Sequence, residues 1–373
     1  MIKTMLPATW QSARRRTILV FSDIGKEVER LAVARYDIGA FFKTAWNKEK
    51  QPDQWKRLAE IIRDRDPDTI ALNYSEIFAL ADGISHMEYE QLTAALPGKY
   101  RGRIVSGEKL AIGWLETRTE PEMQVYPMIC HLAHDIIAEG FSEKVIQPGV
   151  ITTGDLEWWY RERIRELKLT AWFHPSVSLQ RATEADTSFL ANFSKRPAKH
   201  TIRPGDLLHV DFGITYLGLN TDTQQHAYVL KPGEEAAPEG LQQALETGNR
   251  LQDILTSHFV EGRTGNEILA RSRKQAIDEG IKPSIYTHPI GYHGHGAGPT
   301  IGLWDQQEGV PGRGDYPLYP NTAYSIELNA TVNIPEWNKK IRIMLEEDAF
   351  FDGDTVRYID GRQTELHLVP RKN

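Results

Sequence analysis

The spacing of hydrophobic residues divides this chain into a short first part and a longer second part. In the first part, apolar runs at residues 17–20 and 69–72 predict strands, and apolar residues at helical spacing over 54–64 predict a helix between them. A strand, a helix and a strand in this order are typical of a small α/β domain. We therefore expect an N-terminal α/β domain over residues 1–115 and a second domain over residues 116–373.

The second part predicts two pairs of helices set among strands. Apolar residues recur at helical spacing in four segments, 122–137, 152–167, 241–255 and 264–280. Two of these segments open on a capping box, formed by Thr152 with Asp155 and by Thr264 with Glu267. Strands, a helix pair, strands, a second helix pair and further strands describe an α+β fold.

The composition is that of a soluble globular protein, with 40% hydrophobic and 25% charged residues. A net charge of −7 provides no basic surface, so we expect neither nucleic acid nor a membrane as partner. The apolar residues near the N-terminus are followed, not preceded, by Arg14, Arg15 and Arg16, which is not the order of a secretory signal. We expect a cytoplasmic protein, unless a signal preceded Met1 and was removed. Because Cys130 is the single cysteine, an intrachain disulfide is excluded. We expect Cys130 to be a buried residue of a helix.

Two aspartates lie on either side of a glycine-containing break. Asp211 belongs to the apolar run 207–212, and Asp222 follows eleven residues later, beyond Gly213 and Gly218. In a hairpin of antiparallel strands, residues this far apart can lie opposite each other on one face. Two facing carboxylates repel each other unless a cation lies between them. Taken alone, the pair has a simpler interpretation as two aspartates beside a turn.

Three further segments contain imidazoles and carboxylates that could also bind a metal. His293 and His295 lie in the run 292–298, where glycine and alanine let the backbone approach an ion closely. Glu327 and Glu346 each lie in apolar, strand-like sequence, where an ionised carboxylate is costly to bury without a partner. Together with the two aspartates, these residues predict a two-metal hydrolytic site.

Such a site hydrolyses its substrate with a water that two divalent ions share and orient. Carboxylate and imidazole ligands accept Mn, Co, Zn or Fe, of which we expect Mn first. In the expected arrangement Asp222 and Glu346 bridge the ions, Asp211 binds one ion and His295 binds the other. Glu327 is expected to be both a ligand and the proton shuttle, because a carboxylate that touches the bound water can accept its proton.

In order and spacing, these residues resemble the ligands of the pita-bread metallopeptidases, which include methionine aminopeptidase, aminopeptidase P, prolidase and creatinase. The family's order of Asp, Asp, His, Glu and Glu is matched by Asp211, Asp222, His295, Glu327 and Glu346. The resemblance covers residues 116–360 and implies a pita-bread catalytic domain, two bound metal ions, a peptide substrate and a homodimer. It also implies a creatinase-like N-terminal domain, here shortened at its start. Two alternatives stay open, His293 in place of His295 and Glu347 in place of Glu346.

The sequence departs from the family pattern beside the ligands. Family peptidases carry a histidine about seven residues after the ligand histidine, where it hydrogen-bonds the scissile carbonyl, and none lies seven residues after His295. Residues 191–194 also lack the histidine that the family places about eighteen residues before the first aspartate. The side chains considered as substitutes are those of His174, His226, His293 and Tyr324. Of these, His174 and His293 are the candidate catalytic residues.

These features predict a dinuclear metal-dependent peptidase that removes an N-terminal residue from peptides, of the Xaa-Pro aminopeptidase or dipeptidase type. The case for proline specificity is weakened because Arg342 lies four residues before Glu346, whereas the family arginine lies two before its glutamate. Two alternatives remain. One is a non-peptidase metallohydrolase on the same fold, which would explain why the two family histidines are missing. The other is a relative without metal that binds peptides.

Overall fold

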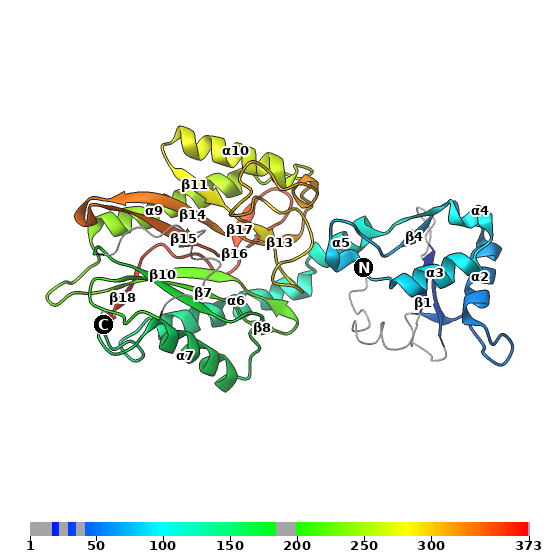
Figure 1. Ribbon diagram of the computed structural model, residues 1–373, viewed down its shortest axis with the longest axis horizontal. Helices are drawn as coiled ribbons and strands as arrows, with labels where there is room; N and C mark the ends of the chain where they lie inside the picture. Colours follow the sequence, from blue (N-terminus) through cyan, green and yellow to red (C-terminus); the bar gives the residue numbers. More distant parts are fainter. Residues whose placement is uncertain (1–16, 22–28, 35–41, 184–198, 372–373) are drawn as a thin grey trace. The chain divides into compact units, whose positions relative to one another are not determined.

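The chain divides into two units, Met1–Trp114 and Leu115–Asn373. A computed structural model describes residues 17–21, 29–34, 42–183 and 199–371 (Figure 1). Each unit has its own hydrophobic core, and each is described by itself. Among the described residues, no helix combines the length and the apolar content needed to cross a membrane.

The first unit consists of short strands and helices. Its elements are β1 (Thr17–Phe21), β2 (Glu29–Val33), β3 (Lys43–Thr44), α2 (Gln54–Arg65), β4 (Ile70–Leu72), η2 (Ala79–Ala81), α3 (His86–Ala95), α4 (Gly98–Arg101), β5 (Ile104–Ser106) and α5 (Glu108–Glu116). Helix α2 begins after Asp53, whose carboxylate accepts hydrogen bonds from the backbone N–H groups of Trp55 and Lys56. The apolar face of α2 buries Leu58 and Ile61. The helix and the two strands predicted here are confirmed.

Four long helices lie among the described residues of the second unit, where the sequence predicts them. They are α6 (Glu120–Gly140), α7 (Thr153–Glu166), α9 (Glu239–Ser257) and α10 (Gly265–Asp278). Thr152 and Thr264 cap α7 and α10, and each hydroxyl oxygen accepts an N–H 3.2 Å away, from Asp155 and Glu267 respectively. Both capping boxes are therefore confirmed, because a cap depends only on residues within four positions of each other.

The strands of the second unit form three main sheets. The first has the order β18-β10-β7-β6, from β6 (Ser176–Gln180), β7 (Leu207–Phe212), β10 (Thr223–Val229) and β18 (His367–Val369). The second has the order β11-β14-β15, from β11 (Lys282–Ile285), β14 (Leu328–Ile334) and β15 (Lys339–Leu345). The third has the order β12-β13-β16-β17, from β12 (His288–Pro289), β13 (Thr322–Ser325), β16 (Asp348–Phe351) and β17 (Val356–Tyr358). Strands β8 (Thr215–Tyr216) and β9 (Leu219–Asn220) form a small separate hairpin, and the short helices η3 (Arg313–Asp315) and η4 (Pro335–Trp337) complete the unit.

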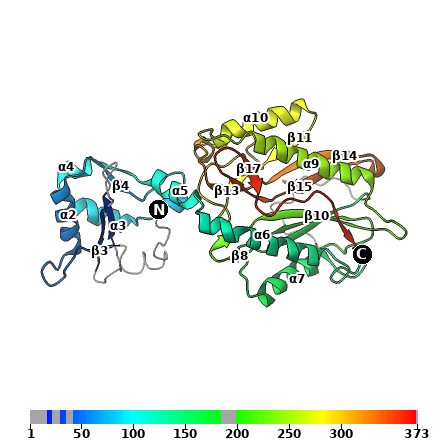
Figure 2. The same ribbon diagram turned by 180° about the vertical axis from the view of Figure 1, so that it is seen from behind.

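Helices cover the strands of the second unit on both outer sides. Figures 1 and 2 show α9 and α10 on one side and α6 and α7 on the other, with the strands between them. One buried cluster joins α9 to β15, and Gly248 allows this close approach, because a Cβ atom there would lie 2.8 Å from Leu345. A second cluster joins α6 and α7 to β7 and includes Cys130, which is buried as predicted. The unit is an α+β domain, as expected.

A pair of backbone hydrogen bonds joins the first sheet to the end of the second. The Gln224 N–H donates to the Glu346 carbonyl at 2.9 Å, and the Glu346 N–H donates to the Gln224 carbonyl at 3.3 Å. This pair connects β10 to the residue that follows β15. It brings side chains from both sheets to one place at the centre of the unit.

An ion pair fixes the start of β7, the strand that carries Asp211. Asp206 is nearly fully buried and accepts two hydrogen bonds from Arg181, at 2.8 Å and 2.7 Å. Asp206→Ala would remove the buried carboxylate that neutralises the charge of Arg181, so we expect the free energy of unfolding to fall by about 3 kcal/mol. Glu162→Ala, which breaks an exposed pair with Arg165, is the control and is expected to change it by less than about 1 kcal/mol. Urea denaturation measures both, and equal effects would contradict this role.

Candidate metal centre

The predicted metal ligands lie on separate elements that meet in the second unit. Asp211 is on β7, Asp222 directly precedes β10, Glu327 lies between β13 and β14, and Glu346 follows β15. Ligand atoms lie within 4.8 Å of one another in three groups, which are Asp211 with Asp222 and Glu346, His288 with Glu327 and Glu346, and Asp222 with His288 and His295. The structure thus brings the five predicted ligands together and adds a sixth residue, His288.

The two aspartates are not paired across the ladder in the way that the hairpin suggested. The ladder partner of Asp211 is Gln224, and Asp222 lies two residues earlier, before β10 begins. The intervening β8–β9 hairpin takes up the extra residues of the break. Asp222 is held instead by its own N–H, which donates to the carboxylate of Asp348 at 3.2 Å. The two carboxylates remain on one face because Asp222 and Gln224 are two residues apart.

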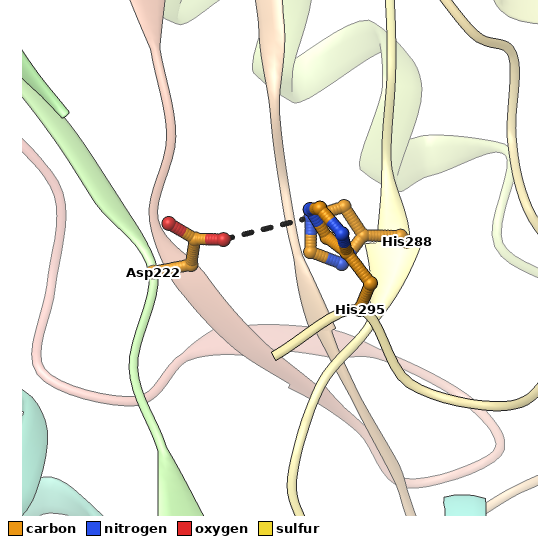
Figure 3. A group of neighbouring side chains, drawn as sticks. All are labelled: Asp222, His288 and His295. Atoms are coloured by element: carbon orange, nitrogen blue, oxygen red, sulfur yellow. Dashed lines mark ion pairs between the residues drawn. The ribbon is translucent and has the colours of Figure 1, made fainter. Parts of the chain in front are cut away.

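The imidazole of His288 lies at the centre of the acidic cluster and is buried. Its Nδ1 donates to the Pro289 carbonyl at 3.1 Å, so the Nε2 atom of a neutral ring carries a lone pair. Three carboxylate oxygens surround this Nε2 atom, at 3.5 Å (Glu346 Oε1), 3.7 Å (Asp222 Oδ2) and 3.9 Å (Glu327 Oε2). Figure 3 shows the ring facing Asp222.

This concentration of acceptors fits a bound cation. Neither His288 Nε2 nor Asp222 Oδ1 has a hydrogen-bond partner, although both atoms are buried. Burial and the neighbouring carboxylate of Glu346 raise the pKa well above its usual range for three acids, Asp211, Asp222 and Glu327. A divalent ion would offset the repulsion between these carboxylates. It would also bind the lone pairs of His288 Nε2 and Asp222 Oδ1. The donor set of carboxylates and one imidazole therefore fits Mn, Co, Zn or Fe.

His295 stands next to His288 but is exposed to solvent. Its ring is nearly perpendicular to that of His288, with the two ring centroids 4.6 Å apart. The ring centroid of Trp172 lies 5.4 Å from that of His295. Burial of part of the ring and the proximity of His288 lower the pKa of His295 to about 4. The ring is thus neutral at pH 7, and a neutral imidazole can donate one hydrogen bond.

The other histidines proposed from the sequence lie outside the three groups of ligand atoms. His174 is exposed and packs against the ring of Trp158. His293 is exposed too, and burial of part of its ring lowers its pKa. His226 is buried and accepts the Met344 N–H at 3.0 Å, which indicates a structural role. The Tyr324 hydroxyl is buried without a hydrogen-bond partner, and residues 191–194 lie outside the described residues.

The structure distinguishes Glu346 from its neighbour. Glu347 points away from the cluster, where its carboxylate lies 2.7 Å from His134 Nε2 and accepts a hydrogen bond from Gln225 at 2.9 Å. Arg342 does not belong to any of the three groups, and its backbone N–H donates to Gln180 at 2.9 Å. Of the two adjacent glutamates, only Glu346 faces the aspartates.

His288 is not among the ligands predicted from the sequence, although its spacing from His295 provides a signal for it. The family pattern places a second histidine about seven residues after the ligand, and His295 lies seven residues after His288. The glycine-rich run around His295 favours that residue as the ligand when only the sequence is considered. If His288 is taken as the first histidine of the pair, His295 stands where the family pattern has the second.

Comparisons with known proteins identify the family of the chain and structures of similar fold. The sequence matches metallopeptidase family M24 over residues 129–351. An X-Pro aminopeptidase from Thermotoga maritima MSB8 is 16% identical with a TM-score of 0.58, over 88% of this chain and 82% of that one. A dipeptidase from Pyrococcus horikoshii OT3 is 17% identical with a TM-score of 0.57, over 95% and 89%. An Xaa-Pro dipeptidase from Bacillus anthracis is 16% identical with a TM-score of 0.55, over 94% and 89%. No curated protein matches the sequence.

Proposed function

We infer that this chain, which belongs to metallopeptidase family M24, is a dinuclear metal-dependent peptidase that removes the N-terminal residue from peptides. The observation that carries this inference is the convergence of three carboxylates on the unpartnered Nε2 atom of a buried histidine. Two structures of similar fold are named for action on Xaa-Pro substrates. We therefore propose Xaa-Pro peptides as the substrate class.

The three groups of ligand atoms suggest how two ions would be shared. Asp211, Asp222 and Glu346 would hold one ion, and His288, Glu327 and Glu346 the other. Glu346 belongs to both groups, so we assign it as a bridge. We also assign His288 in place of His295 as the imidazole ligand. When bound, the ions act as Lewis acids on the scissile carbonyl and lower the pKa of a shared water.

Two side chains of the site are suited to proton transfer and to hydrogen bonding of the substrate. Glu327 is 22% exposed, and its Oε2 is not used by the hydrogen bond that Gln224 donates to Oε1. Glu327 would accept the proton of the attacking water and return it to the leaving amine. His295, neutral and exposed beside His288, would donate its N–H to the scissile carbonyl oxygen.

A nearby cation favours short substrates. Arg313 is exposed, and its charge is one of the smaller causes of the lowered pKa of His295, after burial and the proximity of His288. A guanidinium near His295 would suit the C-terminal carboxylate of a dipeptide. On this observation we favour the dipeptidase over the aminopeptidase among the Xaa-Pro types.

Metal removal and substrate choice test the proposed function together. The purified chain is dialysed against chelator, Mn, Co or Zn is restored, and hydrolysis is followed on Xaa-Pro dipeptides, longer Xaa-Pro peptides and Met-Ala peptides. We expect no cleavage without metal, and release of the N-terminal residue with about two ions per chain, fastest for Xaa-Pro dipeptides and with Mn. Cleavage that persists without metal, or bound metal with no cleavage of any peptide, would overturn the proposal.

The homodimer is carried over from the resemblance to creatinase-like relatives. We propose it as the assembly of the active enzyme. Light scattering on the metal-loaded chain measures its mass in solution. A mass of one chain with full activity would contradict the dimer.

A further inference from the structure

The side chain of Gln224 contacts two of the proposed ligands at once. It lies on β10, is 6% exposed, and its Nε2 donates to Glu327 Oε1 at 2.9 Å and to Glu346 Oε2 at 2.6 Å. An amide nitrogen has two N–H groups, so these two hydrogen bonds use its full donor capacity. Gln224 therefore links, without contributing a charge, the two carboxylates that flank the paired residues Leu328 of β14 and Leu345 of β15.

We propose that Gln224 is a positioning residue that fixes Glu327 and Glu346 for metal binding, an inference that rests on the proposed function. Each carboxylate has two oxygens, and the amide engages only one oxygen of each. Glu346 Oε1 faces His288 and also accepts the Ser325 hydroxyl at 2.6 Å, and Glu327 Oε2 faces His288 as well. Hydrogen bonds from outside the ligand set thus hold both carboxylates in orientation while leaving lone pairs free for ions.

A histidine fixes the orientation of this amide. His209 Nε2 lies 2.9 Å from Gln224 Oε1, and His209 Nδ1 lies 3.4 Å from the Ser178 hydroxyl. With Nε2–H donating to the amide oxygen, the amide nitrogen must face the carboxylates. The reversed amide would place its oxygen against two carboxylates and lose every hydrogen bond. The side chains of Ser178, His209 and Gln224 therefore form a chain of hydrogen bonds that ends at the two proposed ligands.

The backbone contact between the sheets does not depend on this side chain. Gln224 and Glu346 also exchange two backbone hydrogen bonds. Replacement of the side chain by one of similar volume should therefore retain the strand pairing. Gln224→Met has this property, because methionine keeps the length of glutamine and has no N–H donor.

Gln225→Met is a matched control on the next residue of the same strand. Gln225 is 5% exposed, and its amide donates to Glu347 at 2.9 Å, outside the proposed ligand set. Both variants remove a buried amide from β10, so both measure the cost of the substitution itself. Only Gln224→Met removes donors to the ligands.

Calorimetric titration of the metal-free chain with Mn is the test. We expect Gln224→Met to weaken Mn binding about 10- to 100-fold and Gln225→Met to leave it within about twofold of the wild type. The visible spectrum of the Co-loaded chain should change for Gln224→Met alone, because it reports ligand geometry. His209→Phe should weaken Mn binding less, and should add nothing further in the Gln224→Met background.

The outcomes separate this inference from the proposed function. Equal weakening by both variants, or wild-type affinity in Gln224→Met, would overturn the positioning role while the metal centre stands. Absence of Mn binding by the wild-type chain would overturn the proposed function and this inference together. Thermal unfolding of the metal-free proteins shows that the variants fold, and His209→Phe provides a second variant if Gln224→Met does not.

Discussion

Glu346→Gln is expected to abolish peptide hydrolysis and to reduce bound metal from two ions to one or none. Glu346 lies in two of the three groups of ligand atoms, so its loss removes a ligand from both proposed ions. Loss of a group that only supports a ligand costs about 10- to 100-fold. Loss of the shared ligand should therefore lower kcat/KM by more than about 1,000-fold. Glutamine has nearly the same size, so the fold should be retained.

Glu347→Gln is the matched control for this experiment. Glu347 is the adjacent buried glutamate, 1% exposed, and it contacts His134 and Gln225 in place of the ligands. We expect Glu347→Gln to retain two ions and most of the activity, as measured by elemental analysis and steady-state kinetics. If Glu347→Gln lost the metal and Glu346→Gln kept it, the assignment of the last ligand would be reversed.

His288→Ala is expected to lose metal, and His295→Ala is expected to keep it. His288 presents a bare Nε2 to three carboxylates, whereas His295 is exposed and stands beside it. His288→Ala should therefore bind fewer ions per chain and hydrolyse no peptide. His295→Ala should bind two ions with wild-type affinity and show kcat lowered about 100- to 1,000-fold, the cost of removing one donor to a developing oxyanion.

His293→Ala serves as the control for both histidine variants. His293 lies in the same glycine-rich run, is exposed, and does not belong to any group of ligand atoms. We expect its metal content and kcat to equal those of the wild type. Metal loss in His295→Ala with full metal content in His288→Ala would show that the sequence-based assignment of His295 was right and the structural one wrong.

Local features of the fold could be predicted because their signals lie within a few residues. The capping boxes at Thr152 and Thr264 and the apolar periodicity behind them fix where α7 and α10 begin. The strand around Asp211 was predicted in the same way. The alternation of helices and strands was then sufficient for the α+β class.

The identity of the ligands depends on contacts that periodicity does not describe. Glu346 and Glu347 have the same side chain in the same apolar surroundings, and only the backbone pairing of Glu346 with Gln224 decides which one faces the aspartates. His288 has no glycine-rich neighbours to single it out. Its proximity to the carboxylates of Asp222 and Glu346 depends on where the fold places β12, which the sequence pattern does not describe.

Residues that hydrogen-bond the proposed ligands, such as Gln224, could not be predicted from the sequence either. An uncharged amide in a strand carries no signal of function, and no sequence pattern distinguishes Gln224 from Gln225. Strand alternation directs the two amides to opposite faces, one toward the ligands and the other toward Glu347. Such supporting contacts become visible only with the register of β7 and β10.

Anomalous diffraction from crystals grown with Mn would test most directly whether this chain holds a dinuclear centre. We expect two peaks about 3.5 Å apart, the distance typical of two-metal hydrolytic sites. One peak should contact Asp211, Asp222 and Glu346, and the other should contact Glu346, Glu327 and His288 Nε2. Absence of both peaks, or an ion bound by His295 with His288 left free, would contradict the proposed centre.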